Sequence, residues 1–327
     1  MTSYIAVDLG GTNIRAARYT PDAKLLARAK HPTQSDSTDT TILDRVLATI
    51  EEVLPTDGDR VKAISIGAPG PLDPFKGVIL SAPNLPGWVD LPLKEIAQSR
   101  LHIPTELGND ANLAAMGEWK FGAGRGHSDV LYLTISTGIG AGVISSGHLI
   151  VGANGLATEL GHITVLPDGP MCGCGQRGHL EALASGPSIA RAARERLQGG
   201  AKSDVLKYAG GDIEAVTAKH IGEAAQAGDA FAIELLSDAG MHIGHAIADF
   251  MHAFNPSIVI LGGGVTINVG DLLLERRALR RDPRAPRGSQ PAANSPPGQA
   301  RRGRRSARAG RGVCAAGGAT RVADVRP

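Results

Sequence analysis

Apolar and polar residues alternate through the first part of the chain and predict a β-meander. We expect three short strands within residues 3–30, the first at residues 4–7. Between residues 41 and 54, apolar side chains recur at the spacing of an amphipathic helix, and residues 61–67 form another apolar, strand-like run. The order strand, strand, strand, helix, strand describes one α/β unit.

Further elements connect this first unit to a second unit of the same kind. A short helix is expected at residues 92–100, a strand at 104–107 and a helix at 111–121. Strands at 130–135 and around 143–144 then start a second unit. Three helices are expected at residues 185–197, 213–226 and 230–254, and we expect Ser185 to be the N-cap of the first. A buried strand follows at residues 256–261. The pattern predicts two similar lobes with a cleft between them, residues 1–110 and 111–275.

Each predicted unit opens with two strands joined by a glycine-rich turn. The first turn contains Asp8, Gly10, Gly11 and Thr12, and the second, at residues 136–142, contains Thr137, Gly138 and Gly140. Free backbone N–H groups and a threonine hydroxyl suit phosphate oxygens, and glycine lets the backbone approach a ligand closely. An ordinary glycine-rich hairpin explains each turn equally well, and neither matches a P-loop or a dinucleotide-binding motif.

Composition agrees with a globular protein of two domains. The chain has 327 residues, of which 42% are hydrophobic, so it can bury a sizeable core. We expect no membrane span, because no apolar run reaches 18 residues, and no signal peptide. Three cysteines, two of them in a C-x-C pair, favour metal binding or a reducing compartment over a disulfide framework, so we expect a cytoplasmic location.

The net charge of +2 conceals two different kinds of sequence. Residues 276–327 contain 14 Arg, no Lys and two acids, which leaves 20 of the 34 basic and 30 of the 32 acidic residues for the rest. Apolar periodicity also ends near residue 275. We interpret this tail as a disordered segment produced by a frameshift; a nucleic-acid-binding tail is the alternative, because residues 301–305 would attract phosphate.

Two polar positions have both a structural and a chemical interpretation. Asp8 ends a strand beside the first turn, where it either closes an Asx turn or approaches Mg²⁺. Asn109 and Asp110 lie where a strand meets a helix, and capping of that helix is the interpretation that the residues alone favour.

Gly262 and Gly263, at the exit of the last strand, permit either a tight turn or close approach to a ligand.

Cys172, Cys174 and His179 have the spacing of a closed structural zinc site, and His162 can supply a fourth ligand. Two free thiols are the alternative.

These motifs together resemble the sugar kinase and actin-like ATPase superfamily, and within it the ROK family of repressors and sugar kinases, most closely its bacterial glucokinases. The resemblance covers residues 3 to 275 and rests on the two glycine turns, on residues 159–162 and on residues 172–181. It implies two ribonuclease-H-like lobes and ATP-dependent phosphorylation of a hexose, most simply glucose, at the 6-hydroxyl. It also implies Mg²⁺, a structural Zn²⁺ and a homodimer or homotetramer.

The resemblance also assigns roles to residues. Asp110 becomes the general base that takes the proton from the sugar hydroxyl. Sugar-binding positions are Asn84, Asn109, Asp110, Glu159, His162 and Glu181. ATP-binding positions are Asp8, Gly10, Gly11, Thr12, Thr137, Gly138, Gly140, Gly262 and Gly263. The zinc ligands are His162, Cys172, Cys174 and His179, where His179 replaces a cysteine that is usual in the family.

Two other functions stay open. A ROK transcriptional regulator senses sugar and binds DNA through an N-terminal helix-turn-helix, for which we expect no room before Asp8, so no nucleic-acid partner is expected. The other is an inactive kinase, since the final helices of the family are not recognisable after residue 275.

Overall fold

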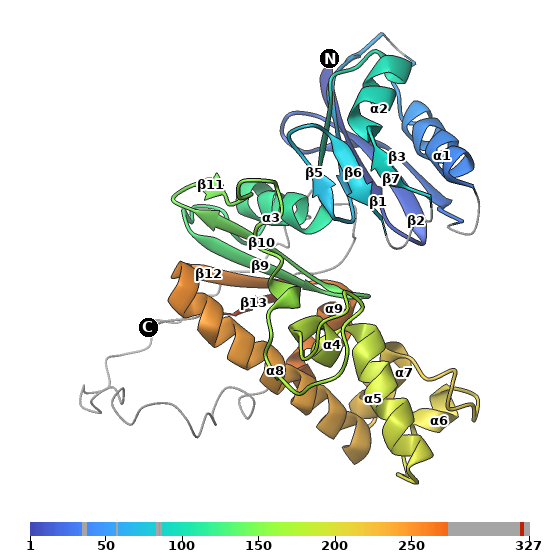
Figure 1. The fold of residues 1–327 in the computed structure, drawn as a ribbon. Helices are drawn as coiled ribbons and strands as arrows, with labels where there is room; N and C mark the ends of the chain where they lie inside the picture. The colour runs from blue at the N-terminus through green and yellow to red at the C-terminus, as the bar shows by residue number, and fades with distance from the viewer. Residues whose placement is uncertain (35–37, 57, 83–84, 86, 274–320, 324–327) are drawn as a thin grey trace, which may run out of the picture.

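The structure of the chain is a computed structural model that describes residues 1–34, 38–56, 58–82, 85, 87–273 and 321–323. Its elements form two α/β lobes (Figure 1). The N-terminal lobe contains a five-stranded sheet in the order β3-β2-β1-β4-β8. These strands are β1 (Thr2–Leu9), β2 (Asn13–Tyr19), β3 (Leu25–Pro32), β4 (Arg60–Ala68) and β8 (Thr105–Asn109).

Two helices, α1 (Asp39–Glu51) and α2 (Leu93–Leu101), pack on the N-terminal lobe. The α1 helix buries Ile42, Val46 and Ile50 completely, as its helical spacing predicts. The side chain of Thr38 caps it by accepting a hydrogen bond from the Thr41 amide. A small sheet of β5 (Leu72–Asp73), β6 (Val78–Ser81) and β7 (Val89–Leu91), which the sequence pattern did not predict, lies at the side of this lobe.

The C-terminal lobe contains a second five-stranded sheet, in the order β11-β10-β9-β12-β13. Its strands are β9 (Val130–Ile135), β10 (Ile139–Ser145), β11 (His148–Leu149), β12 (Ile258–Gly262) and β13 (Arg321–Ala323). The central strand β9 is buried on both faces. Leu131 and Leu133 belong to the large helical core, whereas Val130 and Tyr132 belong to the core beneath α3 (Asp110–Phe121).

Helices cover both faces of this second sheet. The α3 helix lies on one face, and the long α8 helix crosses the other (Figure 1). Besides α3, the described helical elements of this lobe are η1 (Leu160–His162), α4 (Leu180–Ala184), α5 (Gly186–Gln198), α6 (Val205–Tyr208), α7 (Ala218–Gln226), α8 (Ala230–Phe254) and α9 (Gly264–Leu273). Within the described ranges, no helix combines the length and apolar character that a bilayer crossing requires.

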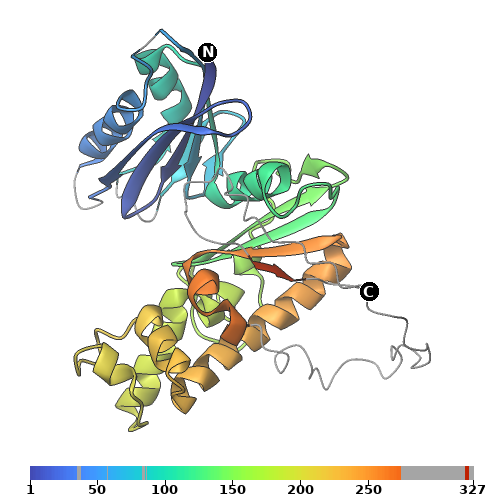
Figure 2. The same ribbon diagram turned by 180° about the vertical axis from the view of Figure 1, so that it is seen from behind.

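Most predicted elements are present, and three predictions need correction. The helix expected at 213–226 starts only at Ala218, because Thr217 caps it with a hydrogen bond from the His220 amide. The second glycine turn is shorter than predicted, because β10 begins at Ile139 and contains Gly140. The tail is not wholly outside the fold, since β13 pairs with β12 through residues 321–323 (Figure 2). Residues 274–320 and 324–327 lie outside the described part.

Candidate functional site

The start of α3 carries Asn109 and Asp110 at the carboxyl end of β8. Asn109 is the N-cap, and its Oδ1 accepts a hydrogen bond of 3.1 Å from the Asn112 amide. Asp110 is the first residue of the helix, and its Oδ1 accepts one from the Ala111 amide at 2.7 Å. Capping therefore falls to Asn109, and a carboxylate oxygen of Asp110 remains available for other contacts.

The carboxyl group of Asp110 titrates far from its ordinary range. Solvent reaches the residue, yet protein surrounds the carboxyl group on most sides, and this desolvation raises its pKa to about 6. The hydrogen bond from Ala111 opposes the increase, while the negative charges of Asp8 and Glu159 add to it. Asp8 comes from the N-terminal lobe and Glu159 from the C-terminal lobe, so carboxylates of both lobes converge here.

The first glycine turn lies beside these carboxylates. The Gly10 amide donates to the Asn13 carbonyl oxygen at 3.0 Å, which closes the turn. Thr33, after β3, donates its amide to the Thr12 carbonyl at 2.9 Å and its hydroxyl to the Gly10 carbonyl at 2.6 Å. Two anchors from one residue hold the turn in place, while Thr12 itself is exposed.

Asp8 has a cationic partner that the sequence analysis did not single out. Arg15 lies opposite Asp8 in the β1–β2 ladder, and its Nη1 is 2.5 Å from the Asp8 Oδ2. The signal was present in the sequence. Asp8 and Arg15 are directly paired residues of one hairpin, so their side chains lie on the same face of the sheet.

The second glycine turn is joined to a carboxylate. The Ile139 amide donates to the Glu181 Oε2 at 2.9 Å, and a Cβ on Gly138 would stand only 2.5 Å from that oxygen. Glycine at position 138 thus leaves space for Glu181, which extends from the first turn of α4. The exposed Thr137 completes the turn.

Three other glycines of the predicted ATP site have a packing reason. A Cβ on Gly140 would stand 2.8 Å from the Ala111 Cβ, so this glycine lets α3 approach β10 closely. One on Gly262 would meet the Tyr132 hydroxyl at 2.5 Å. Gly263 has a φ of +89° and lies against the Ile135 backbone. Close packing within the protein accounts for glycine at these positions.

Four predicted zinc ligands come together in the loop before α4. One donor atom from each of His162, Cys172, Cys174 and His179 lies within 4.8 Å of the others. The Cys174 Sγ is 3.2 Å from the His179 Nδ1, and the Cys172 Sγ is 3.6 Å from the His162 Nδ1. Tetrahedral zinc, with bonds of about 2.0–2.3 Å, separates its ligands by about 3.3–3.8 Å. The donor set therefore fits zinc in chemistry, and the separations of these two pairs are close to those in a tetrahedral zinc site.

Glu181 connects this cluster to the glycine turn. Its Oε1 accepts a contact of 3.8 Å from the Cys172 Sγ, while its Oε2 holds the Ile139 amide. Burial raises the pKa of the Cys172 thiol to about 11, so this sulfur is a protonated thiol unless a cation stabilises the thiolate.

The remaining predicted sugar contacts approach from the same lobe. Glu159 immediately precedes η1, and its pKa is raised by burial, against which the charge of His162 acts. Asn112 is buried, and its Oδ1 accepts a hydrogen bond from the Thr158 hydroxyl at 3.4 Å, which ties the segment before Glu159 to α3. A Cβ on Gly70 would stand 3.6 Å from the Asn109 Nδ2 and 4.0 Å from the Glu159 Oε1. Asn84 lies outside the described residues.

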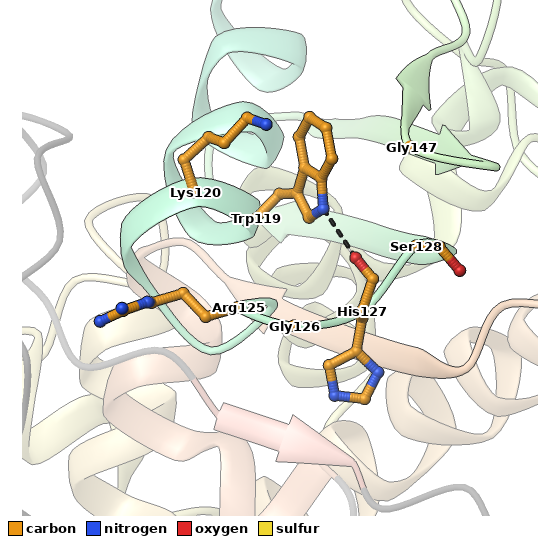
Figure 3. Close-up of a pocket in the computed structure, with 7 residues that line it drawn as sticks. All are labelled: Trp119, Lys120, Arg125, Gly126, His127, Ser128 and Gly147. Carbon is orange, nitrogen blue, oxygen red and sulfur yellow. Dashed lines mark hydrogen bonds between the residues drawn. The ribbon is translucent and has the colours of Figure 1, made fainter.

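Two surface hollows lie away from this convergence. One, of about 440 Å³, is lined by Trp119, Lys120, Arg125, Gly126, His127, Ser128 and Gly147 (Figure 3). Its Trp119 Nε1 donates to the His127 carbonyl at 2.7 Å, and the Lys120 ammonium covers the indole ring. The other, of about 370 Å³, lies between β3 and α1. Neither contains a residue of the predicted site.

Comparisons with known proteins identify the family and agree with the fold. The ROK family model matches residues 4–282. A glucokinase of Thermotoga maritima is 40% identical over 269 residues, which cover 82% of this chain and 84% of that protein. Among solved structures, a ROK family glucokinase of Streptomyces griseus in complex with glucose and AMPPNP is 37% identical, with a TM-score of 0.74 over 85% of this chain and 90% of the other. A ROK family transcriptional regulator has the same TM-score at 27% identity, covering 85% of this chain and 70% of its own.

Proposed function

Since the chain belongs to the ROK family, we propose that it is a sugar kinase that transfers the γ-phosphoryl group of ATP to the 6-hydroxyl of glucose. Its fold is the predicted two-lobed α/β architecture of the actin-like ATPases. The observation that carries the proposal is Asp110, whose carboxyl group has a pKa of about 6 where carboxylates of both lobes meet. A base with a pKa close to neutral suits proton transfer at physiological pH.

In the proposed reaction, the sugar 6-oxygen attacks the γ-phosphorus. The bond from that oxygen to phosphorus forms as the bond to the ADP oxygen breaks, and the electron pair of the broken bond leaves with ADP. Asp110 orients the hydroxyl and accepts its proton. Phosphoryl transfer requires little more of a protein than positioning and charge stabilisation, so one base is sufficient.

The proposed sugar contacts are Asn109, Asp110, Glu159, His162 and Glu181, with Asn84 as a further position outside the described residues. A sugar has many hydroxyl groups and no charge, and convergent carboxylate, amide and imidazole groups can bind it with paired hydrogen bonds. Both Asn109 and Glu159 lie close to Gly70, and this supports an amide and a carboxylate from different lobes as joint sugar contacts.

We propose that the two glycine turns bind ATP through Gly10, Gly11, Thr12, Thr137 and Gly138. Gly140, Gly262 and Gly263 support these segments through packing. Mg²⁺, which favours one or two carboxylates together with phosphates, would neutralise phosphate charge near Asp8.

Zinc is proposed as a structural ion held by His162, Cys172, Cys174 and His179. It would fix the loop that carries His162 and Glu181, because these residues lie within or directly beside the cluster. A homodimer or homotetramer, a cytoplasmic location and a division into residues 1–110 and 111–275 stay predictions.

The test is a coupled assay of ADP formation by the purified protein, with and without glucose. Glucose-dependent ADP formation supports the proposal. Glucose binding without ADP formation would instead favour a sugar-sensing regulator or an inactive kinase, the two alternatives that the family and the aberrant tail raise.

A further inference from the structure

Arg15 is a cation at the proposed site to which the mechanism above gives no role. It lies on β2 directly opposite Asp8 on β1, with 2.5 Å between the Arg15 Nη1 and the Asp8 Oδ2. The two side chains are 33% and 31% exposed, so the pair is neither buried nor free in solvent. A guanidinium in such a position retains donors for a further oxygen ligand.

The sheet register relates this pair to the proposed base. One row of ladder partners crosses five strands in the order Lys30, Arg15, Asp8, Gly67 and Gly108. The two positions that follow Asp8 in this row are glycines, Gly67 on β4 and Gly108 on β8, the strand that leads into Asp110. A Cβ on Gly67 would stand 3.6 Å from the Asp110 Cα, so this row reaches the start of α3 on the face that carries Asp8. The row therefore has a guanidinium towards one end and the proposed base at the other.

Charge is the second part of the argument. The negative charges of Asp8 and Glu159 both act on Asp110, and a transferring phosphoryl group would bring more negative charge to the same place. Positive groups fixed where that charge develops are a major source of catalysis, because they need no reorganisation during the reaction. Lys30 lies one strand farther out and is exposed, so Arg15 is the nearer cation in this row.

We propose that Arg15 is a further catalytic residue, which binds Asp8 through one side of its guanidinium and donates N–H groups to the oxygens of the transferring phosphoryl group. The fork shape of the guanidinium permits both contacts at once, whereas a lysine ammonium offers a single point of charge. Arg15 gains and loses no proton. It stabilises charge while the sugar oxygen replaces the ADP oxygen on phosphorus and Asp110 takes the hydroxyl proton. This inference rests on the proposed kinase function.

The competing role for Arg15 is a purely structural one, in which the ion pair only braces the hairpin of β1 and β2. The two roles predict different nucleotide dependence. A contact to the γ-phosphoryl group affects ATP and its non-hydrolysable analogue AMPPNP but not ADP, which lacks that group. A brace affects all three nucleotides together, in step with the stability of the lobe.

The test compares wild type, Arg15→Ala, Arg15→Lys and the control Arg28→Ala. Arg28 is an exposed arginine on β3 that lies opposite Ala17, one row from Arg15 on the same face, so the control removes the same charge nearby. We expect Arg15→Ala to lower kcat about 10²–10³-fold, the usual effect of removing a donor to a developing charge. AMPPNP affinity should fall, while ADP affinity, glucose affinity and melting temperature stay close to those of wild type. Arg15→Lys should recover only part of kcat, free guanidinium should partly restore Arg15→Ala, and Arg28→Ala should behave as wild type.

Several outcomes would overturn the inference. An unchanged kcat in Arg15→Ala would show that the residue does not touch the reacting group. A parallel loss of AMPPNP affinity, ADP affinity and melting temperature would assign Arg15 to the structural brace. If wild type forms no ADP from glucose and ATP, the proposed function itself fails. This outcome differs from the other two because it appears in the wild-type protein, before any substitution is made.

Discussion

The carboxyl group of Asp110 combines a functional property with a cost to the fold. Protein atoms and two neighbouring carboxylates disfavour its charged form, and this raises its pKa to about 6. A buried asparagine or leucine would avoid that penalty. A residue whose charged form is disfavoured in the folded state, and which lies where carboxylates of both lobes meet, is a candidate for chemistry.

Asp110→Asn should nearly abolish turnover and leave glucose binding largely intact. Asparagine retains the shape and the oxygen that accepts from the Ala111 amide but cannot take a proton, and base catalysis contributes about 10²–10⁴-fold. In wild type, kcat should rise with pH through a pKa near 6, because only the ionised carboxylate accepts the proton. Steady-state rates and glucose titrations check both points. Unchanged turnover in the variant would show that Asp110 is not the base and is only an acidic residue in the first turn of α3.

Thermal unfolding provides the control for a damaged fold. A carboxyl group whose pKa is raised on folding favours the folded state most when protonated, and this contribution is lost as pH rises through the folded pKa of about 6. Asp110→Asn should therefore melt above wild type at pH 8, and the difference should shrink towards pH 4. A variant that melts lower at pH 8 would indicate that its inactivity reflects misfolding.

For single residues, the sequence could not decide which side chain caps the start of α3. Asn109 and Asp110 are both good N-cap residues, and only the backbone shows that Asn109 has the extended conformation and the bond to Asn112. Arg15 was missed because the sequence analysis did not pair residues across the β1–β2 hairpin, which places Arg15 opposite Asp8.

At the scale of elements, close packing between α3 and β10 fixes the position of Asp110. Gly140 and Gly142 lie beneath Ala111 and Ala115, and a Cβ on either glycine would stand less than 3 Å from the alanine above it. The sequence analysis placed these glycines in a phosphate turn because glycine serves close approach to a ligand and close approach to a helix equally well. Gly140 pairs with Thr134 in the β9–β10 ladder, so it lies within a strand beneath α3 rather than in the turn.

Gly140→Ala should lower both stability and kcat, since overpacking costs about 1–3 kcal/mol and pushes the first turn of α3 away from the sheet. The double variant Gly140→Ala with Ala111→Gly removes the closest contact, which is 2.8 Å, and should recover most of both losses. Unfolding curves and turnover of the two variants test this. If the second substitution restores stability but not activity, the backbone of Gly140 takes part in ATP binding directly.

The cluster of His162, Cys172, Cys174 and His179 was predictable, because metal ligands follow a spacing that needs no knowledge of the fold. The connection from Cys172 through Glu181 to the Ile139 amide was not, since it joins residues about 40 positions apart. This connection means that the metal would position the second glycine turn as well as the sugar contacts.

Cys172→Ser should lose zinc, and with it sugar affinity, because His162 and Glu181 depend on an ordered loop. Elemental analysis of wild type should find one zinc per chain. Met171→Ala, at the exposed neighbouring position, should keep both the metal and the affinity. Active wild-type protein that contains no zinc would show that the cluster has been misinterpreted.

At the scale of the molecule, the repeated order of strands and helices was readable from periodicity because each sheet has a definite buried pattern. The small β5-β6-β7 sheet was missed because strands of two to four residues leave almost no alternation to detect. β13 was missed for a different reason. Its three residues lie in an arginine-rich tail whose composition predicts disorder, and only pairing with β12 makes them a strand.

The pairing of β13 with β12 changes the effect expected from truncating the tail. The sequence alone predicts that removal of residues 276–327 has little effect, but β13 covers one side of β12, the strand that leads into Gly263 (Figure 2). Without β13, β12 becomes an edge strand, which is a template for association with other chains. The pairing spans three residue pairs, and each hydrogen bond is worth about 0.5–1.5 kcal/mol before the entropy of ordering the strand is subtracted.

A chain ending at Glu275 should therefore melt slightly below the full chain, by a few degrees at most, and should aggregate more readily. A chain ending at residue 319 keeps most of the tail but lacks β13, so it should match the shorter chain in melting temperature and aggregation. Nucleotide affinity measured on the same three proteins shows whether the effect reaches the site beyond Gly263. If the chain ending at 319 instead behaves as the full chain while the one ending at 275 does not, the stabilising part of the tail lies before residue 320, and the pairing of β12 with β13 contributes nothing measurable.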